Sequence, residues 1–206
     1  MKKRILSAFC AFTMLITMAG CGTTSDNAET TTTTEAVTEA PTPVGPQNYI
    51  PTDENVKLLG RAFYDDFDEE LICAYSGTGC EFTFTGTSVK FNLKGDSAAK
   101  ANNEDNAARY AIYVDGERTQ DLMLDEYTKT ITAFESDAET TAVISLVKLS
   151  ETANSTIAIK SIDVEGTIAP TAEKDLYIEF VGDSITCGYG VDDEDRNHHF
   201  STSTAD

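Results

Sequence analysis

Apolar and polar residues alternate along two neighbouring stretches in the middle of the chain. Residues 80–84 and 89–93 each carry an apolar side chain at every second position, with Glu, Thr, Lys or Asn between them. Successive side chains of a β-strand point to opposite faces, so each stretch predicts a strand with one buried face and one solvated face. Residues 86–88 read as a turn between them, and the pair therefore predicts a β-hairpin.

Further strands are predicted at residues 110–114, 127–134, 141–149 and 156–166, and Asp115-Gly116 predicts a turn after the first of these. In the last stretch the apolar positions change from odd to even numbers between Ile159 and Ile162, which predicts a β-bulge near Lys160 and Ser161. No helical periodicity interrupts the region. Residues 53–168 therefore predict an all-β sandwich of the jelly-roll type.

The pattern changes again after residue 168. Residues 176–181, Leu-Tyr-Ile-Glu-Phe-Val, form a nearly continuous apolar run. Such a run is typical of a strand buried on both faces, as in a parallel sheet. Residues 171–206 therefore predict the beginning of a second, α/β domain, which is too short to enclose a core of several strand-helix units.

The N-terminus has the layout of an export signal. A basic start is followed by an apolar run over residues 5–18 and by two small residues, so residues 1–20 predict a signal peptide. The alternative is a membrane-spanning helix, but the run is shorter than the roughly 20 apolar residues that a bilayer requires. We therefore expect an exported protein.

Cys21 is the candidate lipidation site. Met18-Ala-Gly-Cys21 resembles the lipobox of bacterial lipoproteins, in which the cysteine is lipidated and becomes the mature N-terminus. Each buried methylene of an acyl chain contributes about 0.8 kcal/mol, so several chains would hold the protein on the outer face of the bacterial cell membrane. Ordinary secretion is the alternative. Residues 21–52 are rich in Thr and Pro and poor in large apolar residues, which predicts a flexible linker.

The amino-acid composition limits the classes of molecule that the protein is expected to bind. The 206 residues carry a formal net charge of −20 and contain no Trp and only two His. Such a surface repels nucleic acid, whereas a neutral polysaccharide fits it better. The polar residues 101–108 predict a solvated loop; a calcium loop is disfavoured because the alternating carboxylates and the turn glycine of a dedicated site are absent.

Three cysteines lie in the part expected to fold. Cys73 and Cys80 flank a turn-like segment between two strand patterns, so a disulfide across a hairpin is conceivable. Two buried thiols that face one core explain the same residues without a bond. The third, Cys187, follows the apolar run of the second domain.

The candidate chemistry lies directly after the apolar run, at Gly182-Asp183-Ser184. Open α/β folds place their sites at the carboxyl ends of strands, where a serine is presented to solvent. A serine nucleophile requires a base within hydrogen-bond reach and donors for the oxyanion that it generates. Taken alone, Gly-Asp-Ser is a weak signal, because these three common residues usually mark a plain turn.

The longer run from Ile178 to Gly190 resembles the first conserved block of the SGNH, or GDSL-type, hydrolases, and above all that of carbohydrate esterase family two. The resemblance extends upstream to the family's N-terminal jelly-roll domain, on the segments 76–77, 84–89, 113–116 and 162–166. It covers roughly residues 55–206 of the chain.

The resemblance implies an esterase that removes acetyl groups from plant cell-wall polysaccharides, such as xylan or glucomannan, without metal or cofactor. Ser184 matches the nucleophile, its backbone amide matches one oxyanion donor, and Asp183 matches a supporting residue that orders the loop. The family's Gly and Asn oxyanion residues and its His base would lie beyond residue 206. We therefore expect a C-terminally truncated chain with little activity of its own.

Three alternative interpretations concern the histidines, the acidic run and the function of the whole chain. His198 and His199 are the only histidines, but they follow a polar loop and the family takes its base from elsewhere, so we do not expect either to serve as the base. The acidic run 192–195 predicts a solvated surface rather than a metal site. The alternative function is a surface-anchored lipoprotein whose sandwich binds glycan without catalysis.

Overall fold

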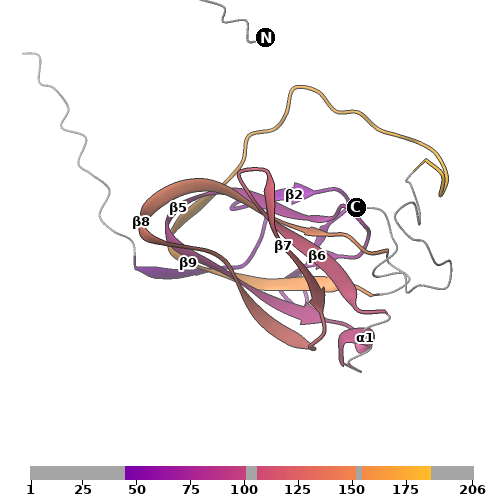
Figure 1. Cartoon of the computed structure of the whole chain (residues 1–206), viewed down its shortest axis with the longest axis horizontal. Helices are drawn as coiled ribbons and strands as arrows, with labels where there is room; N and C mark the ends of the chain where they lie inside the picture. The colour runs from indigo at the N-terminus through magenta and orange to yellow at the C-terminus, as the bar shows by residue number, and fades with distance from the viewer. Residues whose placement is uncertain (1–44, 101–105, 152–154, 187–206) are drawn as a thin grey trace, which may run out of the picture. The chain divides into compact units, whose positions relative to one another are not determined.

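The computed structural model describes residues 45–100, 106–151 and 155–186, which are almost entirely antiparallel β-structure (Figure 1). In chain order the elements are β1 (Pro46–Tyr49), β2 (Lys57–Leu59), β3 (Phe63–Asp65), β4 (Glu70–Cys73), β5 (Gly79–Gly95), α1 (Ser97–Lys100), β6 (Ala108–Val114), β7 (Glu117–Leu124), β8 (Thr128–Lys148) and β9 (Ile157–Pro170). In these ranges no helix has the length and apolar character needed to cross a membrane.

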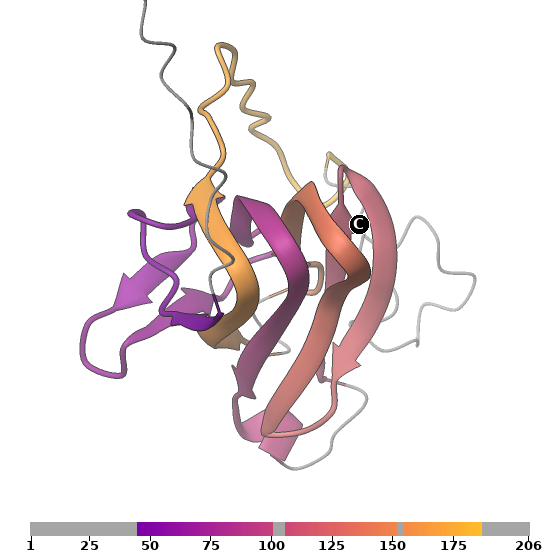
Figure 2. The same cartoon turned by 90° about the vertical axis from the view of Figure 1, so that its left-hand side faces the viewer.

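The strands form one sheet with the order β3-β4-β9-β5-β8-β6-β7. Strand β1 pairs with β9, and β2 pairs with the start of β5. The long strands β9, β5 and β8 lie side by side and curve together (Figure 2). All of the pairings are antiparallel, as the alternating pattern predicts.

The central strand β5 bends so strongly that its two halves face the same core. The rings of Phe82 and Phe91 have centroids 6.0 Å apart. In a straight strand, nine residues would separate them by about 30 Å. The sheet therefore wraps over itself and encloses the apolar side chains between its two halves, as a sandwich does, which confirms the all-β jelly-roll prediction for this region.

The predicted hairpin at residues 80–93 is wrong, because both stretches belong to β5. Gly86 pairs with Gly166 and Ser88 pairs with Glu165, so Thr87 is an extra, unpaired residue. One extra residue shifts the alternation by one position, and a turn and a bulge therefore leave the same mark in the sequence.

The same irregularity explains the predicted gap between residues 134 and 141. The structure has one strand, β8, in place of two, with Thr140 opposite Gly86 and Glu135 opposite Ser88. Residues 136–139 are thus left out of the pairing with β5. Backbones approach closely at this point, since a Cβ on Gly86 would lie 2.0 Å from the carbonyl oxygen of Glu165.

Other predictions are confirmed. In β9, Ser161 pairs with Asn92 and Ile159 with Leu93, which leaves Lys160 as the bulged residue. Asp115 and Gly116 have φ angles of 52° and 81° and form the turn between β6 and β7. The pattern missed β7 itself, a largely exposed edge strand, and β1, which lies within the range assigned to the linker.

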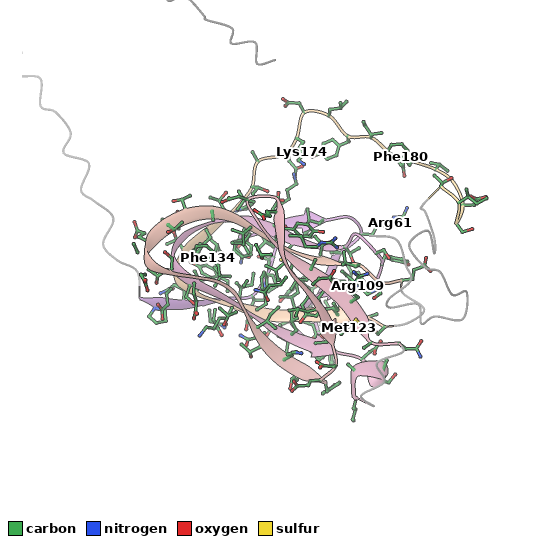
Figure 3. The ribbon with its side chains drawn as sticks, in the orientation of Figure 1. Arg61, Arg109, Met123, Phe134, Lys174 and Phe180 are labelled. Atoms are coloured by element: carbon green, nitrogen blue, oxygen red, sulfur yellow. The ribbon has the colours of Figure 1, made fainter. Side chains whose placement is uncertain are left out.

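The core is aromatic and aliphatic. Phe134, labelled in Figure 3, packs edge-on against Phe84 with a centroid distance of 5.6 Å. Cys73 and Cys80 are both fully buried and both free, so the interpretation as two buried thiols is confirmed and the disulfide is not formed. Burial raises the pKa of Cys73 to about 12, since a thiolate would lose its hydration there.

Candidate functional site

The chain leaves the sandwich at the end of β9 and is tied to it by polar contacts. The Thr171 hydroxyl donates to Glu81 Oε1 over 2.7 Å. Lys57 Nζ donates to the carbonyl oxygen of Ala172 and pairs with Glu173 Oε2, both over 3.3 Å. These contacts fix the first residues after β9 against β2 and β5.

The strand predicted at residues 176–181 is not formed. Leu176, Phe180 and Val181 are 74%, 81% and 90% exposed, and the segment has no regular structure (Figure 3 labels Phe180). A strand buried on both faces requires neighbouring strands and covering helices. Every strand in the described ranges belongs to the sandwich sheet, so this apolar run has no parallel sheet to join.

Ser184 lies at the start of a turn and is exposed. Asp183 shapes this turn, because its Oδ1 accepts the backbone N–H of Ile185 over 3.0 Å and that of Thr186 over 3.4 Å. A Cβ on Gly182 would lie 2.4 Å from the Cβ of Thr186, so the tight turn requires glycine. The local sequence Gly-Asp-Ser therefore folds into an Asx-type turn that presents the serine.

The other predicted site residues lie outside the described residues. These are Cys21, Cys187, His198 and His199, together with the acidic run 192–195 and most of the loop 101–108. Neither histidine, the only residues weighed as a base for Ser184, therefore lies within the described ranges. Among the residues that the structure describes, no group of three or more His, Cys, Asp or Glu is arranged to hold a metal ion.

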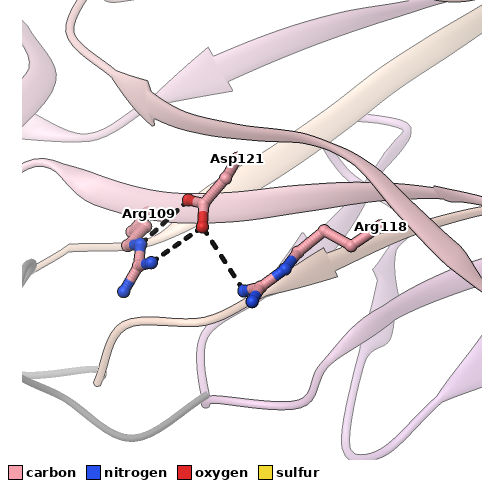
Figure 4. Close-up of polar contacts among 3 residues, drawn as sticks. All are labelled: Arg109, Arg118 and Asp121. Atoms are coloured by element: carbon pink, nitrogen blue, oxygen red, sulfur yellow. Dashed lines mark hydrogen bonds and ion pairs between the residues drawn. The ribbon is translucent and has the colours of Figure 1, made fainter. Parts of the chain in front are cut away.

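Two charged features of the sandwich have structural roles. Arg109 on β6 holds Asp121 on β7 in a bidentate pair at 2.9 and 2.7 Å, and Arg118 adds a contact at 3.3 Å (Figure 4). This pins the edge strand β7. Lys148 is fully buried near the end of β8, where loss of hydration lowers its pKa to about 8.

A polar hollow of about 370 Å³ lies beside the bulge of β5 at Thr87 and the unpaired residues 136–139 of β8, with β9 alongside. We call it the bulge groove. Its hydroxyls come from Thr87, Ser88 and Ser136, and its charged groups from Lys90, Glu135, Asp137 and Glu165. The sequence pattern does not reveal this groove, because residues 86–88 resemble a turn and residues 135–140 a gap between strands.

These features define a class: a jelly-roll-like β-sandwich followed by an apolar segment and an exposed Gly-Asp-Ser turn. Residues 58–171 match the family model described as "Carbohydrate esterase 2 N-terminal". The chain therefore belongs to the carbohydrate esterase 2 family, and its sandwich is the family's N-terminal domain. This confirms the resemblance drawn from the sequence.

Solved structures agree with the assignment. A family two carbohydrate esterase from Cellvibrio japonicus aligns with a TM-score of 0.66 at 16% identity over 78% of this chain and 46% of that one. An acetyl xylan esterase from the rumen bacterium Butyrivibrio proteoclasticus aligns with 0.59 at 21% identity, over 71% and 39%. At these identities the alignments show a shared fold.

A third structure is that of a family two carbohydrate esterase from Clostridium thermocellum in complex with cellohexaose. It aligns with a TM-score of 0.53 at 28% identity, over 66% of this chain and 39% of that one. The present chain thus spans less than half the length of these three structures. No curated protein gave a match to the sequence.

Proposed function

We propose that the chain supplies the sandwich and the nucleophile of a serine carbohydrate esterase that removes acetyl groups from xylan or glucomannan. One combination of observations carries the proposal. The family's N-terminal domain covers residues 58–171, and Gly182-Asp183-Ser184 follows it after the segment 172–181. The serine of this motif is exposed on a turn that Asp183 orders.

In the proposed reaction, a base takes the proton of Ser184 Oγ as this oxygen attacks the acetyl carbonyl. The protonated base then gives the proton to the sugar oxygen, which leaves as its bond to the acetyl carbon breaks. Water then hydrolyses the acyl-serine, which releases acetate and restores the hydroxyl. The backbone N–H of Ser184 would donate to the oxyanion. A base and further oxyanion donors would complete the site, since a serine without them keeps only a small part of the rate.

Two relatives support the choice of substrate. One is described as an acetyl xylan esterase, and another was solved with cellohexaose bound. The acidic composition of the present chain agrees with a neutral polysaccharide, since a net charge of −20 repels polyanions. We further propose that the protein is exported and anchored through lipidated Cys21, or otherwise secreted.

The test uses the full-length coding sequence. Acetate release from acetylated xylan and from acetylated glucomannan is measured for wild type, for Ser184→Ala and for the control Ser97→Ala, which changes an exposed serine on α1. We expect Ser184→Ala to lose roughly 10³-fold or more of kcat, with Ser97→Ala unchanged. Activity that persists in Ser184→Ala, with the fold intact by circular dichroism, would refute the assignment.

Asp183 and Cys21 have separate tests. Asp183→Asn keeps one acceptor oxygen and is expected to lower kcat far less than Ser184→Ala, whereas Asp183→Ala removes the acceptor for both backbone N–H groups. Cys21→Ser is expected to move the protein from the membrane fraction to the soluble fraction without changing kcat. A lipid-free wild type would contradict the proposed anchor.

A further inference from the structure

The bulge groove continues into a second hollow of about 170 Å³, and the two share Ser88, Lys90 and Glu165. The second hollow adds Pro46 from β1 and Asp163 from β9. A volume of about 370 Å³ falls at the lower end of the range typical of ligand sites, roughly 300–1,000 Å³. The groove opens to solvent on the face of the sheet opposite the core.

The backbone builds this groove. Thr87 is extra on β5, and residues 136–139 are extra on β8, so the pairing between β5 and β8 is interrupted at this level while β9 stays paired with β5. The close approach of Gly86 and Gly166 fixes the bend beside it. Bulges of this kind re-aim side chains and are over-represented beside functional sites.

Two of the lining groups have no partner within the described residues. Ser88 is only 8% exposed, yet its hydroxyl makes no hydrogen bond. Lys90 has no carboxylate oxygen within 4.0 Å of its ammonium, although several carboxylates line the same hollow. The Ser88 hydroxyl oxygen itself stays accessible to water, so a ligand hydroxyl can replace that water as its partner.

Two carboxylates of the groove, in contrast, are held in place by hydrogen bonds. Asp163 accepts from Asn48 Nδ2 over 2.5 Å and from Asn92 Nδ2 over 2.7 Å. Glu165 Oε2 accepts from the Thr87 hydroxyl over 3.1 Å. These acceptors are fixed before any ligand arrives, which reduces the entropy lost on binding.

The chemistry of the lining selects the class of ligand. An anion is disfavoured because the carboxylates of Glu135, Asp137, Asp163 and Glu165 outnumber the single ammonium. An apolar ligand would leave polar groups unpaired. A metal ion is disfavoured because no suitable cluster of donors exists in the described residues. A cationic ligand is disfavoured because the unpaired ammonium of Lys90 would repel it.

What remains is a neutral molecule with many hydroxyls, which donate to carboxylates and accept from an ammonium and from serine. We propose that the bulge groove binds a neutral glycan chain at a site separate from Ser184, with Lys90, Ser88 and Glu165 as the main contacts. The choice of polysaccharide as ligand rests on the proposed function. Through this site the sandwich binds the substrate polymer independently of Ser184.

The test measures binding, not catalysis. The full chain is run in native gels that contain arabinoxylan, glucomannan or mixed-linkage β-glucan, and association constants are measured by calorimetry with xylohexaose and cellohexaose. The variants are Lys90→Met, Glu165→Gln and Ser88→Ala. The controls are Lys160→Met, which changes the exposed bulge lysine of β9 outside the groove lining, and Ser184→Ala.

We expect at least one neutral glycan to bind the wild type. Lys90→Met and Glu165→Gln are each expected to weaken that binding roughly tenfold or more, as loss of a hydrogen bond to a charged group does. Ser88→Ala is expected to weaken it by a smaller factor, and both controls should stay within about twofold of wild type. Circular dichroism confirms that each variant is folded.

Three results would overturn the proposal. The first is the absence of binding to every neutral glycan. The second is glycan binding that Lys90→Met and Glu165→Gln leave intact. The third is preferential binding of spermidine or of a chitosan oligosaccharide, which would make the groove a cation site. Because Ser184→Ala keeps binding if the proposal holds, loss of esterase activity and loss of glycan binding are separate outcomes.

Discussion

Replacement of Lys148 by Met removes a fully buried cation from the sandwich and should change how stability depends on pH. The Lys148 ammonium donates to the carbonyl oxygen of Ser150. Burial lowers its pKa from 10.5 to about 8, against smaller opposing effects of Cys73, Asp96 and Glu151. The folded protein thus favours the neutral amine, which the unfolded chain acquires only at higher pH.

The difference between the folded and unfolded pKa of Lys148 sets the sign and the size of its effect on the free energy of unfolding. Between about pH 8 and pH 10.5 the unfolded chain binds more protons at this group than the folded protein does, so the contribution of Lys148 to stability rises with pH. Each pH unit corresponds to about 1.4 kcal/mol, which gives a total of about 3 kcal/mol. Below pH 8 the group is charged in both states, and its penalty is constant.

Urea unfolding followed by circular dichroism at several pH values between 7 and 10.5 measures this effect. The free energy of unfolding of wild type minus that of Lys148→Met should rise by about 3 kcal/mol across the range. Cys73 opposes this trend above pH 9, because its raised pKa costs stability there. Burial is the main cause of that rise and is present in both proteins, so the difference between them removes most of the Cys73 contribution. Lys160→Met, at an exposed site, should run parallel to wild type. A Lys148→Met curve parallel to wild type would refute the argument.

Two further predictions concern the sandwich. Gly86→Ala places a Cβ 2.0 Å from the carbonyl oxygen of Glu165 and should destabilise the fold by at least about 2 kcal/mol in urea unfolding, whereas Gly45→Ala, with no atom within 4 Å of its Cβ, should be neutral; equal stabilities would contradict the bulge. Cys73 and Cys80 should resist alkylation by iodoacetamide at pH 8 until urea is added, as peptide mass spectrometry would show, because buried thiols with raised pKa hold little thiolate. A disulfide-linked pair of peptides would contradict this expectation.

Alternation along the chain was sufficient to predict the sandwich, because the long strands β5, β8 and β9 alternate buried and more exposed residues over much of their length. The bulge at Lys160 was visible for the same reason: the apolar positions change phase within an otherwise regular strand. The equivalent change around Thr87 was assigned to a turn, since Thr-Gly-Thr-Ser is also turn-like in composition. Only pairing partners on β8 and β9 distinguish the two.

The candidate site also has a part that the local sequence predicts and a part that depends on distant residues. The Gly-Asp-Ser turn is local, so its sequence was enough to identify it, and the hydrogen bonds of Asp183 agree with a role in ordering the loop. The strand predicted at residues 176–181 depends on partners far away along a chain, and an apolar run alone does not fold into a sheet. The bulge groove was missed because Lys90, Glu135 and Glu165 meet only in the folded sheet.

The most direct test of the central claim is acetate release from acetylated xylan by the full-length protein and by its Ser184→Ala variant. We expect release by the wild type and a loss of roughly 10³-fold or more in the variant, with the fold unchanged. Equal release by both proteins, or none by a folded, full-length wild type on any acetylated polysaccharide, would contradict it.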